Sequence, residues 1–383
     1  MTFVRALTSP ERRAIQATAF GSWPGESSGE TYAGSSVDPG NAMQLLTVYG
    51  CVAFIADGIS TLPVDVYRNT PTGKVEAPKP EWLAHPTQDL TFESWAGQVL
   101  TSLLVAGNAY LFRDITPSGA MTLAPIDPTK VDVRRQGGRK FFLIDGQMFD
   151  SARVVHIPGL MYPGSDVGLS PVEMARQTIG GGMAAEEFAG KFFDQGAVMS
   201  GVIEVPGDLN PDNARLMAKS WKRAHSGKDK AHLPGVLVGG ATWKPTGVTN
   251  DQAQFLETRK FTAAQIAGLM FRIDPSELGI AVDGTSLTYA NQQQRNIRKR
   301  EVTFLPWTVR LETAISAMLP QPRYMKFNFE GLLRGDVKTR FETYKLASDI
   351  NTAAAAIGQP PLLTTPEMRE FEDFEPLAPT EPA

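Results

Sequence analysis

The residue patterns in this sequence that could carry out chemistry are few, and each lacks its structural context. Residues 25–29 read Gly-Glu-Ser-Ser-Gly and match the G-x-S-x-G pattern. In hydrolases that pattern places a serine nucleophile on a strained turn between a strand and a helix. Here it lies within residues 21–40, which are rich in Gly, Ser and Pro and predict neither element. We interpret the match as chance.

A nucleotide site is not predicted. A phosphate-binding loop needs G-x-x-x-x-G-K followed by Ser or Thr. The pair Gly227-Lys228 has neither the upstream glycine nor the hydroxyl residue. We therefore expect that the chain does not hydrolyse nucleotide and needs no cofactor.

A metal site is not predicted either. The four histidines are scattered along the chain, at positions His85, His156, His225 and His232. His225 and His232 share one segment, but the cysteines and spaced carboxylates of common zinc sites are missing there. A lone carboxylate such as Asp283 is usually a solvated loop residue. We expect no metal and, since no acid, base or nucleophile cluster stands out, no enzymatic activity.

Two basic clusters are the remaining candidates for function. The first comprises Lys219, Lys222, Arg223, Lys228 and Lys230. It predicts either a docking surface or a solvated helix face. The second comprises Arg295, Arg298 and Lys299, with Arg300 next to them. Spacings of three and four place these three on one helix face, which predicts either a basic binding surface or a set of ion pairs with acidic side chains.

Composition limits the class of protein. The chain of 383 residues is 42% hydrophobic and 20% charged, which predicts a folded protein with two or three packed units. Its formal net charge of -4 argues against strong binding to DNA through phosphate contacts. A single cysteine, Cys51, excludes an intrachain disulfide. We expect no signal peptide and no membrane span, and hence a protein made in the cytoplasm.

The elements follow from periodicity and caps. Residues 45–59 and 91–107 predict amphipathic helices, the second capped by Thr91 and ended by Gly107. Short strands are predicted between them and up to residue 157, with a hairpin turn at Asp145-Gly146. Residues 41–165 thus predict one α+β unit.

The second half is predicted to be mostly helical. Ser170-Pro171 starts a helix to about Gln195, in which the glycines at 180–182 predict a bend or a close approach of another backbone. A strand–helix–strand insert follows, with strands at 201–205 and 235–238 and a helix capped by Asn210. Helices are then predicted at 250–271, at 289–319 with a kink at Pro306, and beyond 335, where the chain ends in an acidic tail.

Five phrases in this order resemble the portal proteins of tailed bacteriophages, in particular the siphophage, Hong Kong-type subfamily. They are YGCVAFIADGISTLPVDVY (49–67), GLSPVEMARQTIGGGMAAEEFAGKFFDQG (168–196), WKPTGVTNDQAQFLETRKFTAAQIAGLM (243–270), YANQQQRNIRKREVTFLPWTVRLETAI (from 289) and the segment 335–377. No single phrase is diagnostic, but five in order are specific. The resemblance covers about residues 41–377.

The resemblance implies an α+β portal fold with wing, helical stem, small α/β clip and helical crown. Its implied divisions are a flexible N-terminal arm (1–40), the wing (41–168), a first stem helix (169–199), the clip (200–247), a second stem helix (248–278), a tunnel loop (279–288), a long kinked helix with wing return (289–334), and the crown with its acidic tail (335–383). The tunnel-loop residues that would face DNA are Asp283, Gly284, Thr285, Ser286 and Thr288.

The implied function is non-enzymatic. A portal is a ring, dodecameric in virions, at one capsid vertex, and it conducts double-stranded DNA during packaging and ejection. Its implied partners are the terminase large subunit, the head–tail adaptor and the major capsid protein, and its location is the virion after assembly in the host cytoplasm. The alternative is another virion structural protein, such as an adaptor or a minor capsid protein.

Overall fold

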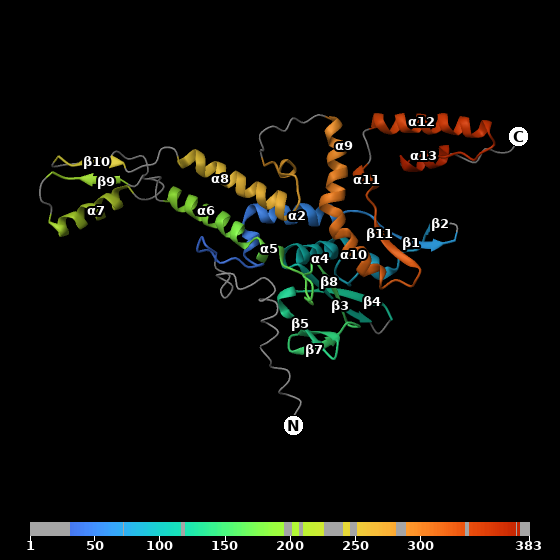
Figure 1. Cartoon of the computed structure of the whole chain (residues 1–383), viewed down its shortest axis with the longest axis horizontal. Coiled ribbons are helices and arrows are strands. Elements are labelled where there is room, and N and C mark those ends of the chain that lie inside the picture. Colours follow the sequence, from blue (N-terminus) through green and yellow to red (C-terminus); the bar gives the residue numbers. More distant parts are fainter. Residues whose placement is uncertain are drawn as a thin grey trace, which may run out of the picture. The chain divides into compact units, whose positions relative to one another are not determined.

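The computed structural model forms two compact units, which are described separately (Figure 1). The first contains residues 1–285 and 301–327, and the second contains residues 286–300 and 328–383. The residues that the structure describes are 31–71, 73–115, 119–194, 201–206, 210–225, 240–245, 251–280, 289–333, 337–372 and 374–375.

Two packed helices form the centre of the first unit. They are α2 (Leu46–Ser60) and α4 (Phe92–Ala106). Thr91 caps α4 by accepting the Ser94 amide, and Gly107 ends it in a left-handed conformation (φ 69°), as the sequence predicted. Their facing sides are fully buried, as expected for amphipathic helices: Val48, Val52, Ile55 and Ile59 meet Trp95, Val99, Leu100 and Leu103.

Three antiparallel sheets of three strands complete this part. Their orders are β11-β1-β2, β4-β3-β8 and β5-β6-β7. The strands are β1 (Val64–Thr70), β2 (Gly73–Glu76), β3 (Asn108–Ile115), β4 (Met121–Ile126), β5 (Val131–Gln136), β6 (Arg139–Ile144), β7 (Gln147–Asp150), β8 (Val154–Pro158) and β11 (Arg323–Phe327). The short helical segments are η1 (Ala42–Gln44), which precedes α2, and α3 (Glu81–Ala84) and η2 (Pro128–Lys130), which lie between strands.

The predicted hairpin at Asp145-Gly146 is confirmed. These two residues join β6 to β7 with φ values of 47° and 82°. Positive φ at both central positions is the requirement of the tight hairpin turn for which Asp-Gly is favoured. Register is set because Phe142, on the inner side of β6, is buried against Tyr110 of β3 and Val154 of β8.

The glycine triplet is part of one uninterrupted helix. Helix α5 (Pro171–Met174) is followed by α6 (Arg176–Asp194), which runs through residues 180–182. A Cβ at Gly180 would lie 2.5 Å from Cγ2 of Thr31, and one at Gly182 would lie 3.1 Å from Cδ2 of Leu45. The glycines therefore do not interrupt the helix, and the close approach at them comes from side chains rather than from a backbone.

The same contacts correct the expectation of a flexible arm over residues 1–40. Thr31 and Val37 are buried, at 7% and 3% exposure. The Tyr32 amide donates to Oε1 of Gln177 at 3.0 Å. Thr31 and Tyr32 thus contact α6, since Gly180 leaves room for Thr31. Residues 1–30 lie outside the described residues.

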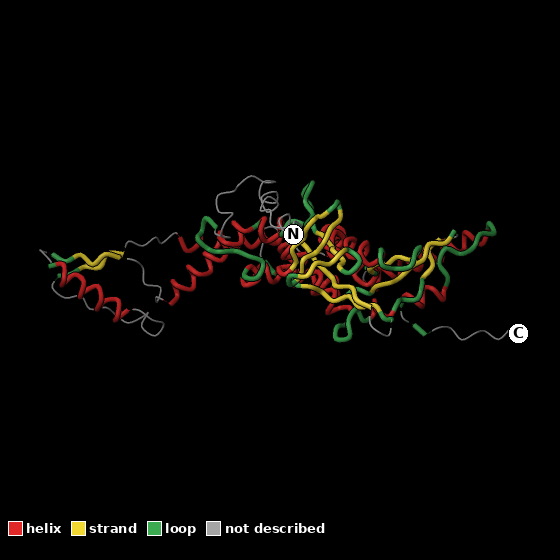
Figure 2. The backbone as a smooth tube through the Cα atoms, turned by 90° about the horizontal axis from the view of Figure 1, so that it is seen from below, coloured by secondary structure: helices red, strands yellow, loops and turns green. Residues whose placement is uncertain are grey.

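The insert is a strand pair with a helix beside it (Figures 1 and 2). Strand β9 (Gly201–Glu204) pairs antiparallel with β10 (Thr242–Pro245), and α7 (Pro211–His225) lies between them in sequence. Asn210 caps α7 by accepting the Asp212 amide at 3.1 Å, as predicted. The strand predicted at 235–238 lies outside the described residues, and the described partner of β9 is β10.

The chain returns through α8 (Asp251–Gln265), a π-helical turn at Ile266–Met270 and a 3-10 helix at Pro275–Leu278. Further along, α9 (Tyr289–Arg298) leads into a π-helical segment (Lys299–Phe304) and α10 (Leu305–Ser316). The π segment ends just before Pro306. Proline has no amide hydrogen to donate to the carbonyl one turn earlier. The wider π turn accommodates this missing hydrogen bond at the position where the sequence predicted a kink.

The C-terminal part of the second unit is a helix pair, preceded by α11 (Glu330–Leu333). In it α12 (Val337–Ala356) packs on α13 (Thr365–Phe371). Glu372 joins the two, since Nε of Arg340 donates to it at 2.7 Å and the Tyr344 hydroxyl at 2.7 Å. A capping box between Thr364 and Glu367 fixes the start of α13.

Candidate functional site

The feature that organises the candidate site is a helix pair that brackets the insert. Gly182 of α6 lies next to Thr262 of α8, and Glu186 forms an ion pair with Arg259 at 3.5 Å. Because the α6 positions rise while the α8 positions fall, the helices are antiparallel, as Figure 1 shows. The chain therefore leaves along α6, forms the insert and returns along α8.

The insert presents part of the first basic cluster. Lys219 and Arg223 are exposed on α7, four residues apart and thus on one helix face. Lys222 belongs to the same helix, whereas Lys228 and Lys230 lie outside the described residues. Across the strand pair, Lys244 forms an ion pair with Glu204 at 2.8 Å. The structure thus brings together the helical members of the predicted docking cluster.

The predicted tunnel loop begins at a defined turn. Asp274 caps the 3-10 helix by accepting the Ser276 amide at 3.0 Å, and Gly279 ends it with φ 71°. The residues proposed from the sequence to face DNA lie beyond this turn and outside the described residues: Asp283, Gly284, Thr285, Ser286 and Thr288.

The second basic cluster lies at a change of helix type. Arg295 and Arg298 are in the last turn of α9, and Lys299 starts the π-helical segment. Arg298 is exposed, whereas Arg295 and Lys299 are half-buried. Next to them, the guanidinium of Arg300 lies 5.4 Å from the centre of the Phe329 ring. A guanidinium near an aromatic ring is attracted to it, so Arg300 has a local structural contact here.

Sequence reasoning missed a polar network around His156. The His156 ring stacks on Tyr110, its partner across β3 and β8, with centroids 4.6 Å apart. Its Nε2 lies 2.9 Å from Oδ1 of Asn108, and its Nδ1 lies 3.3 Å from Nζ of Lys140. Only the alternation of β8 could have indicated that this histidine points into the protein.

The network determines the protonation state of His156. A lysine ammonium only donates, so Nδ1 accepts and the ring proton is on Nε2, which donates to Asn108. Burial, together with the positive charge of the nearby Lys140, lowers the pKa of His156 to about 3. Asn108 also accepts the Gly168 amide at 2.6 Å, and Nζ of Lys140 donates to the Asp166 carbonyl at 2.8 Å. A neutral, fully bonded histidine of this kind positions the loop at 159–170 and is not set up for acid–base chemistry.

The other histidines are not brought together. His85 is exposed after α3, and His225 ends α7. His232 lies outside the described residues. Within the described ranges, no group of three or more His, Cys, Asp or Glu side chains could hold a metal ion. In the same ranges no helix is both long enough and apolar enough to cross a bilayer.

Solved structures share this fold. The chain superposes on a structure described as the neck of an empty gene transfer agent particle computed with C6 symmetry, with a TM-score of 0.59 and 21% identity. That match covers 92% of this chain and 97% of the other. An HK97 family phage portal protein from Corynebacterium diphtheriae gives a TM-score of 0.57 at 14% identity, covering 78% of this chain and 98% of the other. The mixed α/β architecture is thus that of portal proteins, as predicted.

The sequence matches are equally extensive. The chain is 31% identical over 366 residues to the probable portal protein of Streptomyces phage phiC31, covering 90% of this chain and 78% of that protein. It is 27% identical over 377 residues to the portal protein of Enterobacteria phage HK97, covering 93% and 85%. The model of the phage portal protein family matches residues 46–373.

The class that fold and sequence define is a structural component of a phage-like particle. The chain belongs to the phage portal protein family. Portal proteins are virion proteins of the head–tail connector and are structural rather than enzymatic, which confirms the expected class. The alternative of an adaptor or minor capsid protein is not retained, because the family model covers most of the chain.

Proposed function

We propose that this chain assembles into a closed ring at a unique capsid vertex and forms the channel through which double-stranded DNA is packaged and ejected. The observation that carries the proposal is the antiparallel pair α6–α8 bracketing a small α/β insert, in a chain of the portal family. One related structure is described as a gene transfer agent neck computed with C12 symmetry, at a TM-score of 0.53. Twelve copies around one axis are the corresponding expectation here.

In this proposal, each segment of the chain that was delimited from the sequence forms one part of the portal subunit. Residues 41–168 supply the wing, α6 and α8 the stem, residues 200–247 the clip and residues 335–383 the crown. The long helix of residues 289–334 returns into the wing. The clip is where the terminase large subunit docks during packaging and the head–tail adaptor docks afterwards, while the outer wing meets the major capsid protein. The ring forms in the host cytoplasm and remains in the virion.

DNA passage constrains the chemistry of the channel. A channel that conducts any sequence must not read bases, and strong phosphate contacts would slow each step. Small polar residues in the loop at 279–288 suit sliding, and they are Thr285, Ser286 and Thr288, beside Asp283 and Gly284. In such a channel the second basic cluster forms ion pairs between subunits rather than binding DNA. Its members are Arg295, Arg298 and Lys299.

The first experiment is negative-stain electron microscopy of the purified full chain, viewed along its axis. A ring with a central hole is the expected result, and symmetry analysis of the images gives the number of subunits. A persistent monomer or dimer at high protein concentration would remove the basis for a channel. Deleting residues 281–288 is then expected to leave rings intact while impairing DNA packaging or retention, and normal packaging and retention would exclude a role for the loop.

A further inference from the structure

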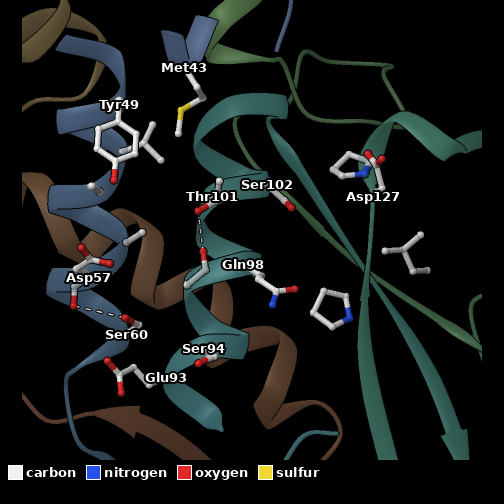
Figure 3. Close-up of a pocket in the computed structure, with 17 residues that line it drawn as sticks. Met43, Tyr49, Asp57, Ser60, Glu93, Ser94, Gln98, Thr101, Ser102 and Asp127 are labelled. Atoms are coloured by element: carbon white, nitrogen blue, oxygen red, sulfur yellow. Dashed lines mark hydrogen bonds between the residues drawn. The ribbon is translucent and has the colours of Figure 1, made fainter. Parts of the chain in front are cut away.

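A groove on the wing has a chemical character that the proposed function does not use. It has a volume of about 750 Å³ and runs between α2 and α4, with residues 125–128 as its third wall (Figure 3). Small residues are part of its lining, among them Ala53, Ala56 and Gly97. A Cβ added at Gly97 would have no neighbouring atom within 4 Å, so the groove is open above this position.

The charge of the groove has one sign. Asp57 and Glu93 lie at one end, and Asp127 lies on the wall beyond Gln98 (Figure 3). All three carboxylates are exposed, and none of the described residues that line the groove is basic. Hydrogen bonds from Thr129 lower the pKa of Asp127, so it is ionised at neutral pH. A partner for this groove should therefore be cationic and should carry small apolar side chains.

The chain's own N-terminal segment has this composition. Residues 1–20 contain three arginines, Arg5, Arg12 and Arg13, against one acid, Glu11. The arginines are followed by a run of small and apolar residues, Ala14-Ile15-Gln16-Ala17-Thr18-Ala19-Phe20. The segment therefore has the positive charge and the small apolar side chains that the groove would accept.

Chain length permits the contact. The described part starts at Thr31, and Met43 already lines the groove. The path from Thr31 to Met43 spans at most about 40 Å when fully extended. The thirty preceding residues reach about 100 Å, which is more than enough to return to this groove or to that of a neighbouring copy.

We infer that residues 1–20 bind in the groove between α2 and α4 and neutralise its carboxylates. The segment then acts as a strap over the helix pair at the centre of the wing. Because the attraction acts between exposed charges, it weakens as salt shortens the screening length from about 10 Å at 0.1 M to about 3 Å at 1 M.

The test is photo-crosslinking in the full chain. A benzophenone amino acid replaces Gln16 or, in a second variant, Thr18, and the crosslinked peptides are identified by mass spectrometry. The expected partners are peptides from 46–60, 92–106 and 121–130. Mixing isotopically labelled and unlabelled chains distinguishes a strap within one subunit from one between copies, and both support the inference.

Two pairs of variants, each with a matched control, test whether the crosslinks depend on the groove. Gly97→Leu fills the groove from a position where a side chain has free space and is expected to reduce the groove crosslinks roughly tenfold, as loss of a packed contact does. Gly181→Leu adds the same side chain at an exposed, equally open position on α6 and should leave them unchanged. Asp57→Asn with Glu93→Gln should lower the yield roughly fivefold, since exposed ion pairs are weak, whereas Glu76→Gln should not. Crosslinks to other regions, or groove crosslinks that persist in Gly97→Leu, would overturn the inference.

Discussion

Thr31 occupies the space that a side chain at Gly180 would need. A Cβ built at Gly180 would lie 2.5 Å from Cγ2 and 2.6 Å from Oγ1 of Thr31. Thr31 is itself held in place, because its hydroxyl donates to the Ser35 carbonyl at 2.9 Å. Thr31 is therefore packed against α6 at a helix position that must lack a side chain.

Gly180→Ala is expected to destabilise the protein although alanine is the better helix former. The gain in helix propensity is about 1 kcal/mol, whereas the overlap with Thr31 costs about 1–3 kcal/mol. The neighbouring Gly181 is open, so Gly181→Ala should raise stability by about 0.5–1 kcal/mol. Thermal unfolding of both variants measures the difference. Adding Thr31→Gly to Gly180→Ala removes the overlapping atoms and should recover most of the loss; equal effects at 180 and 181 would contradict the contact.

Gly107→Ala is expected to be more damaging. Gly107 has φ 69°, and a Cβ there would lie 2.0 Å from the Leu169 carbonyl oxygen, a backbone atom that cannot rotate away. We expect a loss of more than about 3 kcal/mol or failure to fold. Gly138→Ala is the control, since its φ is 81° but its surroundings are open, and a loss of about 1 kcal/mol is expected. Similar losses at both sites in denaturant unfolding would mean that only the φ angle matters.

Gly107 and Gly180 show which structural features could be predicted from the sequence and which could not. Gly107 was predicted as a helix end, because a glycine after an amphipathic stretch is a local signal. The caps by Thr91, Ser170 and Asn210 and the turn at Asp145-Gly146 were predicted for the same reason, and all are confirmed. Gly180 was interpreted as a bend or as the close approach of another backbone. The side chain that approaches it, Thr31, could not be identified because it is far away in the sequence.

The candidate site divides in the same way. The order of helix, insert and helix was predictable from periodicity and from five ordered phrases, and so was the portal family. The groove between α2 and α4 was not predictable, because Asp57, Glu93 and Asp127 come from three separate elements. The His156 network was missed because its members lie on β3, β6, β8 and a loop. The pairing of β3 with β8 and the packing of β6 from a second sheet against them bring these residues together.

The stability of the protein is expected to fall below pH 6.5 because of His156. Its pKa is about 3 in the folded state and about 6.5 when unfolded, so between these values only the unfolded chain takes up the proton. The folded state is fully favoured above pH 6.5 and loses about 2 kcal/mol from this group by pH 5. Urea unfolding from pH 7.5 to 4.5 measures the slope. His156→Gln removes the titrating group, so its curve should be flatter by this amount; parallel curves would show that His156 is not buried as a neutral ring.

Reversing charge on α7 is expected to weaken docking at the clip while leaving the fold unchanged. Lys219 and Arg223 are exposed on one face of a helix, so replacing both with glutamate should change stability by no more than about 0.5 kcal/mol each. If this face meets an acidic surface of the packaging ATPase, association should slow by roughly tenfold or more and become less sensitive to salt. Surface plasmon resonance with purified rings at two ionic strengths measures both effects.

The control variant is Lys130→Glu with Arg139→Glu, which introduces the same charge change at exposed positions on other elements and should not alter docking. Unchanged association of the α7 variant, with its rings intact in electron micrographs, would instead identify this face as solvated and move the docking surface elsewhere on the insert.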